Sequence, residues 1–287
     1  MSIKTKKPSF EIPRIILWTG KTIAFFSTYL AVRYALYIFG KPQRHHLPKR
    51  EIAFYKTAKS KRIFVSTIRK HIQLYQLGSS DKKILLIHGW SGRGTQLYKI
   101  AETLADQGFE ILSFDGPAHG ESSGNHTIFE EFVETVLYLN HTHGNFQAAI
   151  GHSFGGMILL NAIYRGMVLD KFTIISSGNK VEDVIKSFVK NIHLSPKVAK
   201  KMIQYIENRT GKDIDQLASS EFIRNSSIPG LIIHDNSDFE VPVSCAYQIK
   251  DSIKNGTLLI TENLGHRRIL RDPQVINEII TFKKDDQ

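Results

Sequence analysis

The sequence predicts an α/β protein built on a mainly parallel β-sheet. From about residue 62 onward, short apolar runs alternate with amphipathic stretches. Continuous apolar runs are typical of strands that are buried on both faces, and the stretches between them have helical spacing. Strand–helix alternation of this kind favours a parallel sheet with helices on both faces.

The composition agrees with a folded domain that buries a sizeable core. The chain has 287 residues, of which 41% are hydrophobic and 23% charged. With 20 Gly, 9 Pro and no low-complexity tract, the sequence excludes collagen-like, coiled-coil and wholly disordered classes. The single cysteine, Cys245, excludes a disulfide scaffold and any CxxC motif, and it indicates a reducing compartment. We therefore expect a cytoplasmic protein.

The positive charge is concentrated at the N-terminal end. The formal net charge is +11, but residues 1–80 hold 16 Lys and Arg against 2 Asp and Glu, whereas the rest holds 22 basic and 25 acidic residues. A protein that binds a duplex spreads its cations over the folded surface, so we expect no nucleic-acid partner. Basic residues beside an apolar segment point instead to an anionic membrane surface as a partner of residues 1–50.

Residues 1–61 are predicted to form a separate basic, aromatic helical segment with a linker. Residues 15–39 are long enough for a spanning helix, which needs about 20 apolar residues. However, Lys21 and Arg33 leave only 11 uncharged residues between them. Three alternatives stay open: a helix packed on the main domain, an anchor in the membrane interface, and a true span.

Residues 62–287 are predicted to form the main domain. It opens on an antiparallel hairpin of 62–67 and 71–77, and the first buried parallel strand is 84–89. Further strands are expected at 110–116, 147–153, 171–178, 230–235 and 257–263. Helices are expected at 95–108, 128–140, 154–166, 243–253 and 273–282. Residues 179–227 show helical patterns without a strand, which predicts a small helical cap or lid.

The motif GHSFGG at residues 151–156 lies between a predicted strand and a predicted helix. In that context G-x-S-x-G describes a nucleophile elbow, in which Ser153 occupies a tight turn and glycines avoid clashes across the bend. The next backbone N–H, from Phe154, lies at a helix N-terminus, where developing negative charge is favoured. The alternative is a small-residue turn with a capping serine.

A serine nucleophile needs a histidine base and a carboxylate behind that base. His266 follows the last predicted strand, so it lies at the same edge of the sheet as Ser153. Asp238 follows the preceding strand and is the predicted acid, with Asp235 as the reserve. The order Ser…Asp…His is the one expected of this architecture.

The loop HGWSGRG at residues 88–94 follows the first parallel strand. The backbone N–H of Trp90 is the predicted second donor to a substrate oxyanion. His88, His119 and His152 are expected to have structural roles. The chain contains no metal-ligand spacing and no phosphate-binding glycine pattern, so we expect no metal site.

These residues resemble the α/β-hydrolase family, specifically its lysophospholipase-like and serine-aminopeptidase-like esterases. The resemblance covers about residues 62–285, and its motifs are 88–90, 114–124, 151–156, 234–242 and 265–266. It implies the α/β-hydrolase fold, a triad of Ser153, Asp238 and His266, and oxyanion donors at Trp90 and Phe154. The family needs no cofactor. One departure is His234-Asp235, where the family often has His-Gly.

The resemblance implies a serine hydrolase that cleaves a carboxylic ester of a lipid or other small acyl substrate through an acyl-enzyme. Thioesterases, amidases and peptidases share this machinery, so the sequence does not separate them. A non-catalytic, membrane-associated binding or receptor protein on the same fold is the alternative from another class. The substrate and the oligomeric state stay open.

Overall fold

The computed structural model describes residues 12–144 and 146–284 and divides into two compact units. We call them the helical unit, residues 12–39 with 180–217, and the sheet unit, which holds the other described residues. Residues 1–11 of the predicted N-terminal segment lie outside the described residues. The boundaries predicted from the sequence, at 61/62 and around 179–227, remain predictions.

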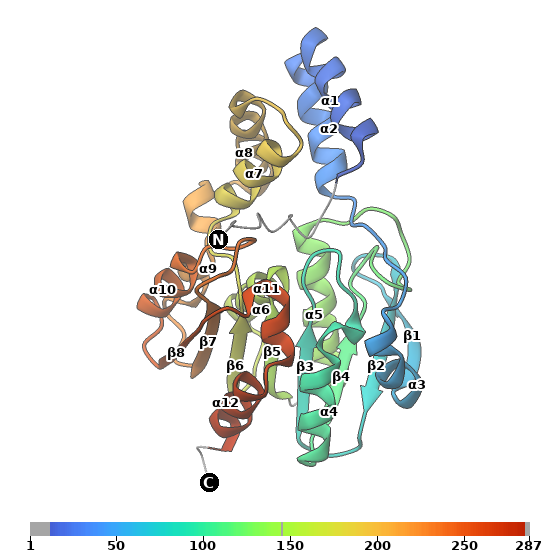
Figure 1. Cartoon of the computed structure of the whole chain (residues 1–287), viewed down its shortest axis with the longest axis vertical. Coiled ribbons are helices and arrows are strands. Elements are labelled where there is room, and N and C mark those ends of the chain that lie inside the picture. Colours follow the sequence, from blue (N-terminus) through green and yellow to red (C-terminus); the bar gives the residue numbers. More distant parts are fainter. Residues whose placement is uncertain (1–11, 145, 285–287) are drawn as a thin grey trace, which may run out of the picture. The chain divides into compact units, whose positions relative to one another are not determined.

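In the described residues the sheet unit contains one eight-stranded sheet (Figure 1). Its strands are β1 (Lys59–Val65), β2 (Lys70–Leu77), β3 (Lys83–Ile87), β4 (Glu110–Phe114), β5 (Phe146–His152), β6 (Lys171–Ile175), β7 (Gly230–Asp235) and β8 (Gly256–Thr261). The spatial order is β1-β2-β4-β3-β5-β6-β7-β8. The pairs β1–β2 and β2–β4 are antiparallel and all the others are parallel. The predicted fold class is confirmed.

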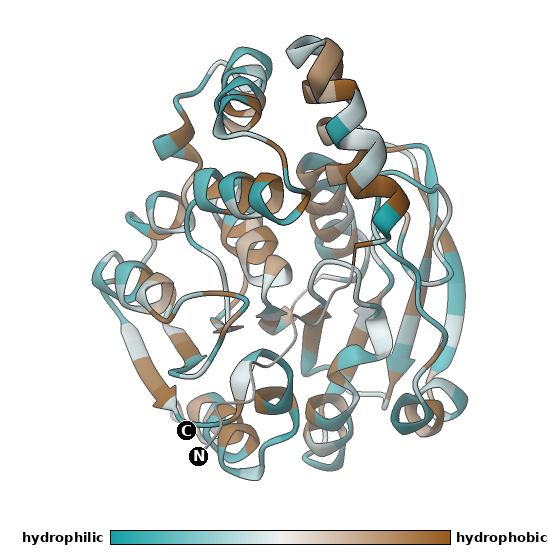
Figure 2. Ribbon diagram, turned by 45° about the horizontal axis from the view of Figure 1, so that its top comes forward, coloured by the Kyte–Doolittle hydropathy of each residue, from teal (hydrophilic) through white to brown (hydrophobic). Residues whose placement is uncertain are grey.

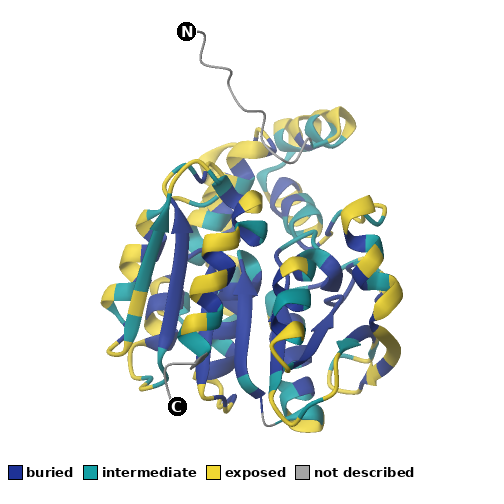
Figure 3. Ribbon diagram, turned by 60° about the horizontal axis from the view of Figure 1, so that its bottom comes forward, coloured by how far each residue is buried: buried dark blue, intermediate teal, exposed yellow. Residues whose placement is uncertain are grey.

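Helices pack on both faces of this sheet, because its central strands are apolar on both sides. Every residue of β4, β6 and β7 is buried (Figure 3). In β3, Ile84 and Leu86 join one apolar cluster, while Leu85 and Ile87 are buried on the opposite face. The helices are α3 (Ile52–Thr57), α4 (Tyr98–Asp106), α5 (Phe129–His143), α6 (Phe154–Tyr164), α9 (Ser219–Ile223), α10 (Ser244–Asp251), α11 (Gly265–Arg268) and α12 (Pro273–Lys284).

The segment expected to be a linker contributes to the sheet unit. Residues 49–57 form a 3-10 turn and α3, and Phe54 is fully buried with its ring 6.3 Å from that of Tyr75. The first strand begins at Lys59, three residues before the start predicted from its apolar run. The first four residues of β1 are exposed and polar, so the apolar pattern that predicts a strand is absent there.

The helical unit contains α1 (Arg14–Phe26), α2 (Thr28–Phe39), α7 (Val181–Asn191) and α8 (Pro196–Thr210). The stretch 15–39 is not one helix, because the backbone is extended at Ser27. The chain folds back there, and the Tyr34 hydroxyl donates to the Ile16 carbonyl at 2.9 Å. Among the described residues we find no helix with the length and apolar character that a membrane span requires.

The core of the helical unit joins segments that are far apart in the sequence. Ala31 and Ala35 of α2 are fully buried in a cluster with Ile185 of α7 and Met202 of α8. Small side chains at these two positions let α2 approach α8 closely. The N-terminal helices therefore pack against the helices of the predicted insertion.

Candidate active site

Ser153 lies at the junction of β5 and α6, in a strained backbone conformation. Its φ is 55° and its ψ is −120°, a region that non-glycine residues rarely adopt. The Ser153 N–H donates to the Ile175 carbonyl at 2.9 Å, and the Gly156 N–H donates back to the Ser153 carbonyl at 3.0 Å. These bonds hold the strand-to-helix turn that the elbow motif predicted.

Three glycines make this turn sterically possible. A Cβ atom on Gly151 would lie 2.5 Å from the Gly155 carbonyl oxygen, and one on Gly155 would lie 2.3 Å from the Ile87 carbonyl oxygen. A Cβ atom on Gly89 would lie 3.1 Å from Cβ of Ser153. Backbone atoms cannot yield as a side chain can, so glycine is required at 151 and 155, as the sequence indicated.

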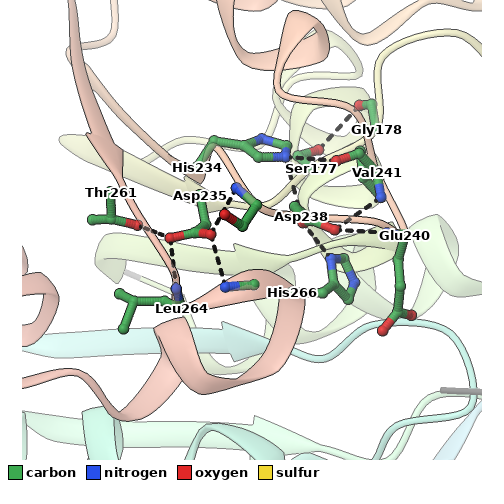
Figure 4. Close-up of polar contacts among 12 residues, drawn as sticks. Ser177, Gly178, His234, Asp235, Asp238, Glu240, Val241, Thr261, Leu264 and His266 are labelled. Atoms are coloured by element: carbon green, nitrogen blue, oxygen red, sulfur yellow. Dashed lines mark hydrogen bonds and ion pairs between the residues drawn. The ribbon is translucent and has the colours of Figure 1, made fainter. Parts of the chain in front are cut away.

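His266 and Asp238 form a direct side-chain contact at the same edge of the sheet. Nδ1 of His266 lies 2.7 Å from Oδ2 of Asp238 (Figure 4). An ionised carboxylate only accepts hydrogen bonds, so Nδ1 carries the proton and Nε2 keeps its lone pair. That Nε2 atom forms no hydrogen bond with any residue that the structure describes.

The carboxylate of Asp238 is held in its charged form. Burial raises the pKa of this carboxyl, but hydrogen bonds from His234, His266 and the Val241 N–H outweigh burial and hold the pKa well below its usual range. Nε2 of His234 lies 3.4 Å from Oδ2, and the Glu240 N–H donates to Oδ1 at 2.9 Å. The Asp238 side chain that contacts His266 is therefore a carboxylate anion.

Asp235, the reserve choice for the acid, has a different environment. Its carboxylate accepts four hydrogen bonds, from the N–H groups of Ser237, Leu264 and Gly265 and from the Thr261 hydroxyl, at 2.8–3.0 Å (Figure 4). Three of these partners, Thr261, Leu264 and Gly265, belong to the strand end and backbone that lead into His266. Asp235 thus fixes the loop that carries the histidine, a role that the unusual His-Asp pair did not by itself reveal.

The short helix α11, which carries His266, is also hydrogen-bonded to the elbow. His152 immediately precedes Ser153, and its Nε2–H donates to the His266 carbonyl at 2.9 Å. The two imidazole rings lie 4.8 Å apart. Burial lowers the pKa of His152 far below its ordinary value, so this ring stays neutral. Ser153 is half-buried, and its hydroxyl makes no hydrogen bond within the described part of the chain.

Trp90 and Phe154, the predicted oxyanion donors, lie together. Their rings meet edge to face with centroids 5.3 Å apart. The backbone turns sharply after Trp90, because Ser91 has a φ of 55° and the Gly92 N–H closes onto the Gly89 carbonyl. Neither the Trp90 N–H nor the Phe154 N–H donates to a described residue, so both are available to a ligand.

The remaining histidines near the site have structural roles, as expected. Nε2 of His88 accepts from the Gly116 N–H at 2.8 Å, and Nδ1–H donates to the Gly89 carbonyl at 2.7 Å. Burial lowers the pKa of His88 to about 4. His119 similarly bridges the Pro117 carbonyl and the Ser91 N–H. Both rings connect the Trp90 loop to the loop after β4.

Asp115 was not singled out by sequence reasoning, although it lies in the motif 114–124. It is fully buried and accepts from the Gly94 and Glu121 N–H groups at 2.7 Å and from the Tyr75 hydroxyl at 3.0 Å. Burial raises the pKa of this carboxyl despite these bonds. The residue anchors two loops beside the site rather than acting in it.

The helical unit contains a groove of about 1050 Å³ between α7 and α8. None of the predicted catalytic residues lines it. Within residues 12–144 and 146–284, no cluster of three or more His, Cys, Asp or Glu side chains is arranged to hold a metal ion. The candidate site is therefore defined by the contacts around Ser153 and His266.

Known structures show the same architecture. A protein described as a lipase, from Acinetobacter baumannii, aligns with a TM-score of 0.65 and 20% identity, covering 83% of this chain and 96% of that one. An Exiguobacterium antarcticum esterase aligns with a TM-score of 0.61 and 14% identity, covering 79% of this chain and 100% of that one. A Bacillus anthracis bromoperoxidase aligns with a TM-score of 0.62 and 16% identity, over 79% and 100% of the two chains.

The chain has the α/β-hydrolase fold. A family model described as alpha/beta hydrolase fold matches residues 82–208, which include β3, the elbow and β6. A curated relative, the pimeloyl-[acyl-carrier protein] methyl ester esterase of Vibrio cholerae, is 26% identical over 107 residues. That match covers 37% of this chain and 41% of the relative's length.

Proposed function

We propose that this protein is a serine hydrolase that cleaves a carboxylic ester of a lipid or other small acyl substrate. The observation that carries the proposal is the 2.7 Å contact between His266 and Asp238, on a loop that His152 ties to the strained Ser153 turn. The proposed nucleophile, orienting carboxylate and base follow the carboxyl ends of β5, β7 and β8, which lie at one edge of the sheet. The similarity to an ester-cleaving relative supports the same reaction class.

In the proposed acylation, Oγ of Ser153 attacks the ester carbonyl carbon while its proton passes to Nε2 of His266. The tautomer set by Asp238 leaves the lone pair on that nitrogen, as the step requires. The tetrahedral intermediate collapses when the alkoxide leaves and takes the proton from Nε2. The alcohol departs, and the acyl group remains on Ser153.

In deacylation, a water molecule attacks the acyl carbonyl and gives a proton to Nε2 of His266. Collapse of the second intermediate returns that proton to Oγ of Ser153 and releases the carboxylic acid. In both steps the Asp238 carboxylate stabilises the imidazolium, and the carboxylate remains ionised because its pKa is held low.

The oxyanion of each intermediate would be bound by the backbone N–H groups of Trp90 and Phe154. Both groups lack a partner among the described residues, and the Phe154 N–H lies at the N-terminus of α6. Donors of this kind stabilise charge that develops only in the transition state, and removal of one donor typically costs about 10²–10³ in rate. Glycine at 89 allows the Trp90 loop to approach Ser153.

The test is active-site labelling with a fluorophosphonate, combined with turnover of acyl esters of graded chain length, including a lysophospholipid. We expect the wild type to be labelled and to hydrolyse at least one ester, and Ser153→Ala to lose both activities. Ser252→Ala, which removes a half-buried serine beyond the end of α10, is the matched control and should retain both.

Equal labelling of the wild type and Ser153→Ala would contradict the proposal. Absence of labelling in the folded wild type would favour the non-catalytic binding protein instead. Among acyl substrates, thioesters and amides undergo the same two steps, so parallel assays with these two classes would separate esterase from thioesterase and peptidase activity.

A further inference from the structure

Helix α1 of the helical unit bears apolar side chains on its exposed side as well as on its packed side. Its inward stripe, which includes Leu17, Gly20 and Ile23, faces the rest of that unit. Its outward stripe is the position where a surface helix normally carries polar residues. Here that stripe bears the exposed side chains of Ile15, Trp18, Phe25 and Phe26.

The exposure of these side chains is large. Trp18 is 68% exposed, Phe25 85% and Phe26 78%. Tyr29 and Leu30, which open α2 just after the turn at Ser27, are 67% and 52% exposed. Figure 2 shows apolar segments recurring along this pair of helices. We call these six residues, Ile15 to Leu30, the hairpin patch. A helix that is apolar on both sides is normally covered on both sides.

The charged residues of α1 and α2 all have one sign. The exposed charged residues of α1 and α2 are Arg14, Lys21 and Arg33, and residues 12–39 contain no Asp or Glu. The sequence segments of the helical unit, 1–39 and 180–217, hold 14 Lys and Arg against 6 Asp and Glu. The rest of the chain holds 24 against 21, so most of the net positive charge belongs to this unit.

Exposed aromatic side chains together with cations favour a lipid surface as the partner. A protein partner would recognise a large apolar patch mainly through complementary shape. Exposed Trp, Phe and Tyr side chains interleaved with Lys and Arg instead suit the headgroup region of a lipid bilayer. There the rings enter the acyl boundary while the cations stay at anionic phosphates. The two short helices match an element that lies in the interface, since neither meets the length of a span.

We propose that the hairpin patch docks the protein on an anionic lipid surface. Trp18, Phe25 and Phe26 insert at the level of the headgroups, and Arg14, Lys21 and Arg33 bind the lipid phosphates. The α1–α2 hairpin is thus a monotopic membrane anchor. Its action requires none of the residues around Ser153, so it stands independently of the proposed hydrolase activity.

Flotation of the full-length protein with vesicles tests this proposal. We expect the wild type to float with vesicles of phosphatidylcholine and phosphatidylglycerol and to bind less to phosphatidylcholine alone. Phe25→Ser/Phe26→Ser should weaken binding to both kinds of vesicle by at least about tenfold, because the variant lacks two aromatic rings that insert into the bilayer. Lys21→Gln/Arg33→Gln should weaken binding to the anionic vesicles alone, by about fivefold for each charge.

The matched control is Phe64→Ser/Val168→Ser, which removes two exposed apolar side chains from the sheet unit and should float like the wild type. Brominated acyl chains should quench the fluorescence of Trp18 and leave that of Trp90, so Trp18→Phe should lose the quenching. Ser153→Ala should float like the wild type, which separates this proposal from the enzymatic one.

Three outcomes would overturn the proposal. The folded wild type could fail to float with anionic vesicles, or Phe25→Ser/Phe26→Ser could float as well as the wild type. Alternatively, analytical ultracentrifugation could find a wild-type dimer that this double variant converts to a monomer, with no flotation of either. That last result would assign the hairpin patch to a second copy of the chain.

Discussion

Oδ2 of Asp238 lies 2.7 Å from Nδ1 of His266, and the two residues come from segments that follow neighbouring parallel strands, the loop after β7 and helix α11 after β8. The contact joins positions 28 residues apart. A second carboxylate, Asp235, accepts hydrogen bonds from the backbone of Leu264 and Gly265, directly before His266. Asp238 therefore contacts the imidazole ring, whereas Asp235 holds the backbone before it. Substitutions of the two aspartates can separate these two roles.

Asp238→Asn should leave the fold intact and lower kcat by about 10³–10⁴-fold. An amide at this position can hold the ring in the wrong tautomer, so Nε2 loses its lone pair. Ester hydrolysis and fluorophosphonate labelling rates measure the effect. Glu240→Gln, in the same loop, is the control and should stay within about threefold of the wild type. A similar loss in both variants would contradict the assignment of Asp238.

Asp235→Asn should act on stability first. An amide has one acceptor oxygen, so two of the four donors that Asp235 now satisfies would face an NH₂ group. Unsatisfied buried donors cost about 1–3 kcal/mol each, and we expect the free energy of unfolding to fall by about 2–4 kcal/mol. Urea denaturation followed by circular dichroism measures this. A change below about 0.5 kcal/mol, which is ordinary for surface positions, would refute the role.

Gly155→Ala should be far more damaging than Gly166→Ala. The new Cβ at 155 would meet the backbone oxygens of Ile87 and His88 at 2.3 and 2.6 Å, so β3 and α6 would have to separate. At 166 the Cβ would meet nothing within 4 Å, and only the φ of 98° costs energy, about 1 kcal/mol. Thermal unfolding of the two variants compares them. Equal melting temperatures would show that the elbow is not tightly packed.

Stability should fall when the solution is acidified from pH 7.5 to pH 5. Burial lowers the pKa of His88 to about 4, whereas the unfolded chain has the ordinary value of 6.5. Between these values the unfolded state binds more protons, so the free energy of unfolding decreases as pH falls. At pH 5 the contribution of His88 alone is about 2 kcal/mol.

His119 and His152 are buried with pKa values shifted in the same direction, so they add to this loss. Urea titrations at several pH values measure it. His88→Gln should show a smaller decrease between pH 7.5 and pH 5 than the wild type. Unchanged or greater stability at pH 5 would contradict the buried, neutral state of these rings.

Much of the sheet could be predicted from local pattern. The runs at 110–116, 147–153 and 230–235 overlap β4, β5 and β7 with shifts of at most two residues. Strands covered on both faces must be apolar throughout, so the sequence marks them clearly. The first strand was placed too late and α3 was missed, because half-exposed elements carry a weaker signal.

The sequence by itself determined that Ser153 stands on a tight strand-to-helix turn, since the glycines around it are dictated by distances of a few residues. It also placed Asp238 and His266 at strand ends. Only the tertiary structure shows that Asp238, and not Asp235, contacts His266, because both carboxylates lie at the end of β7 and their contacts depend on residues that follow β8. It likewise decided that α1 and α2 pack with α7 and α8. Contacts between segments so distant depend on three-dimensional packing, which local periodicity does not encode.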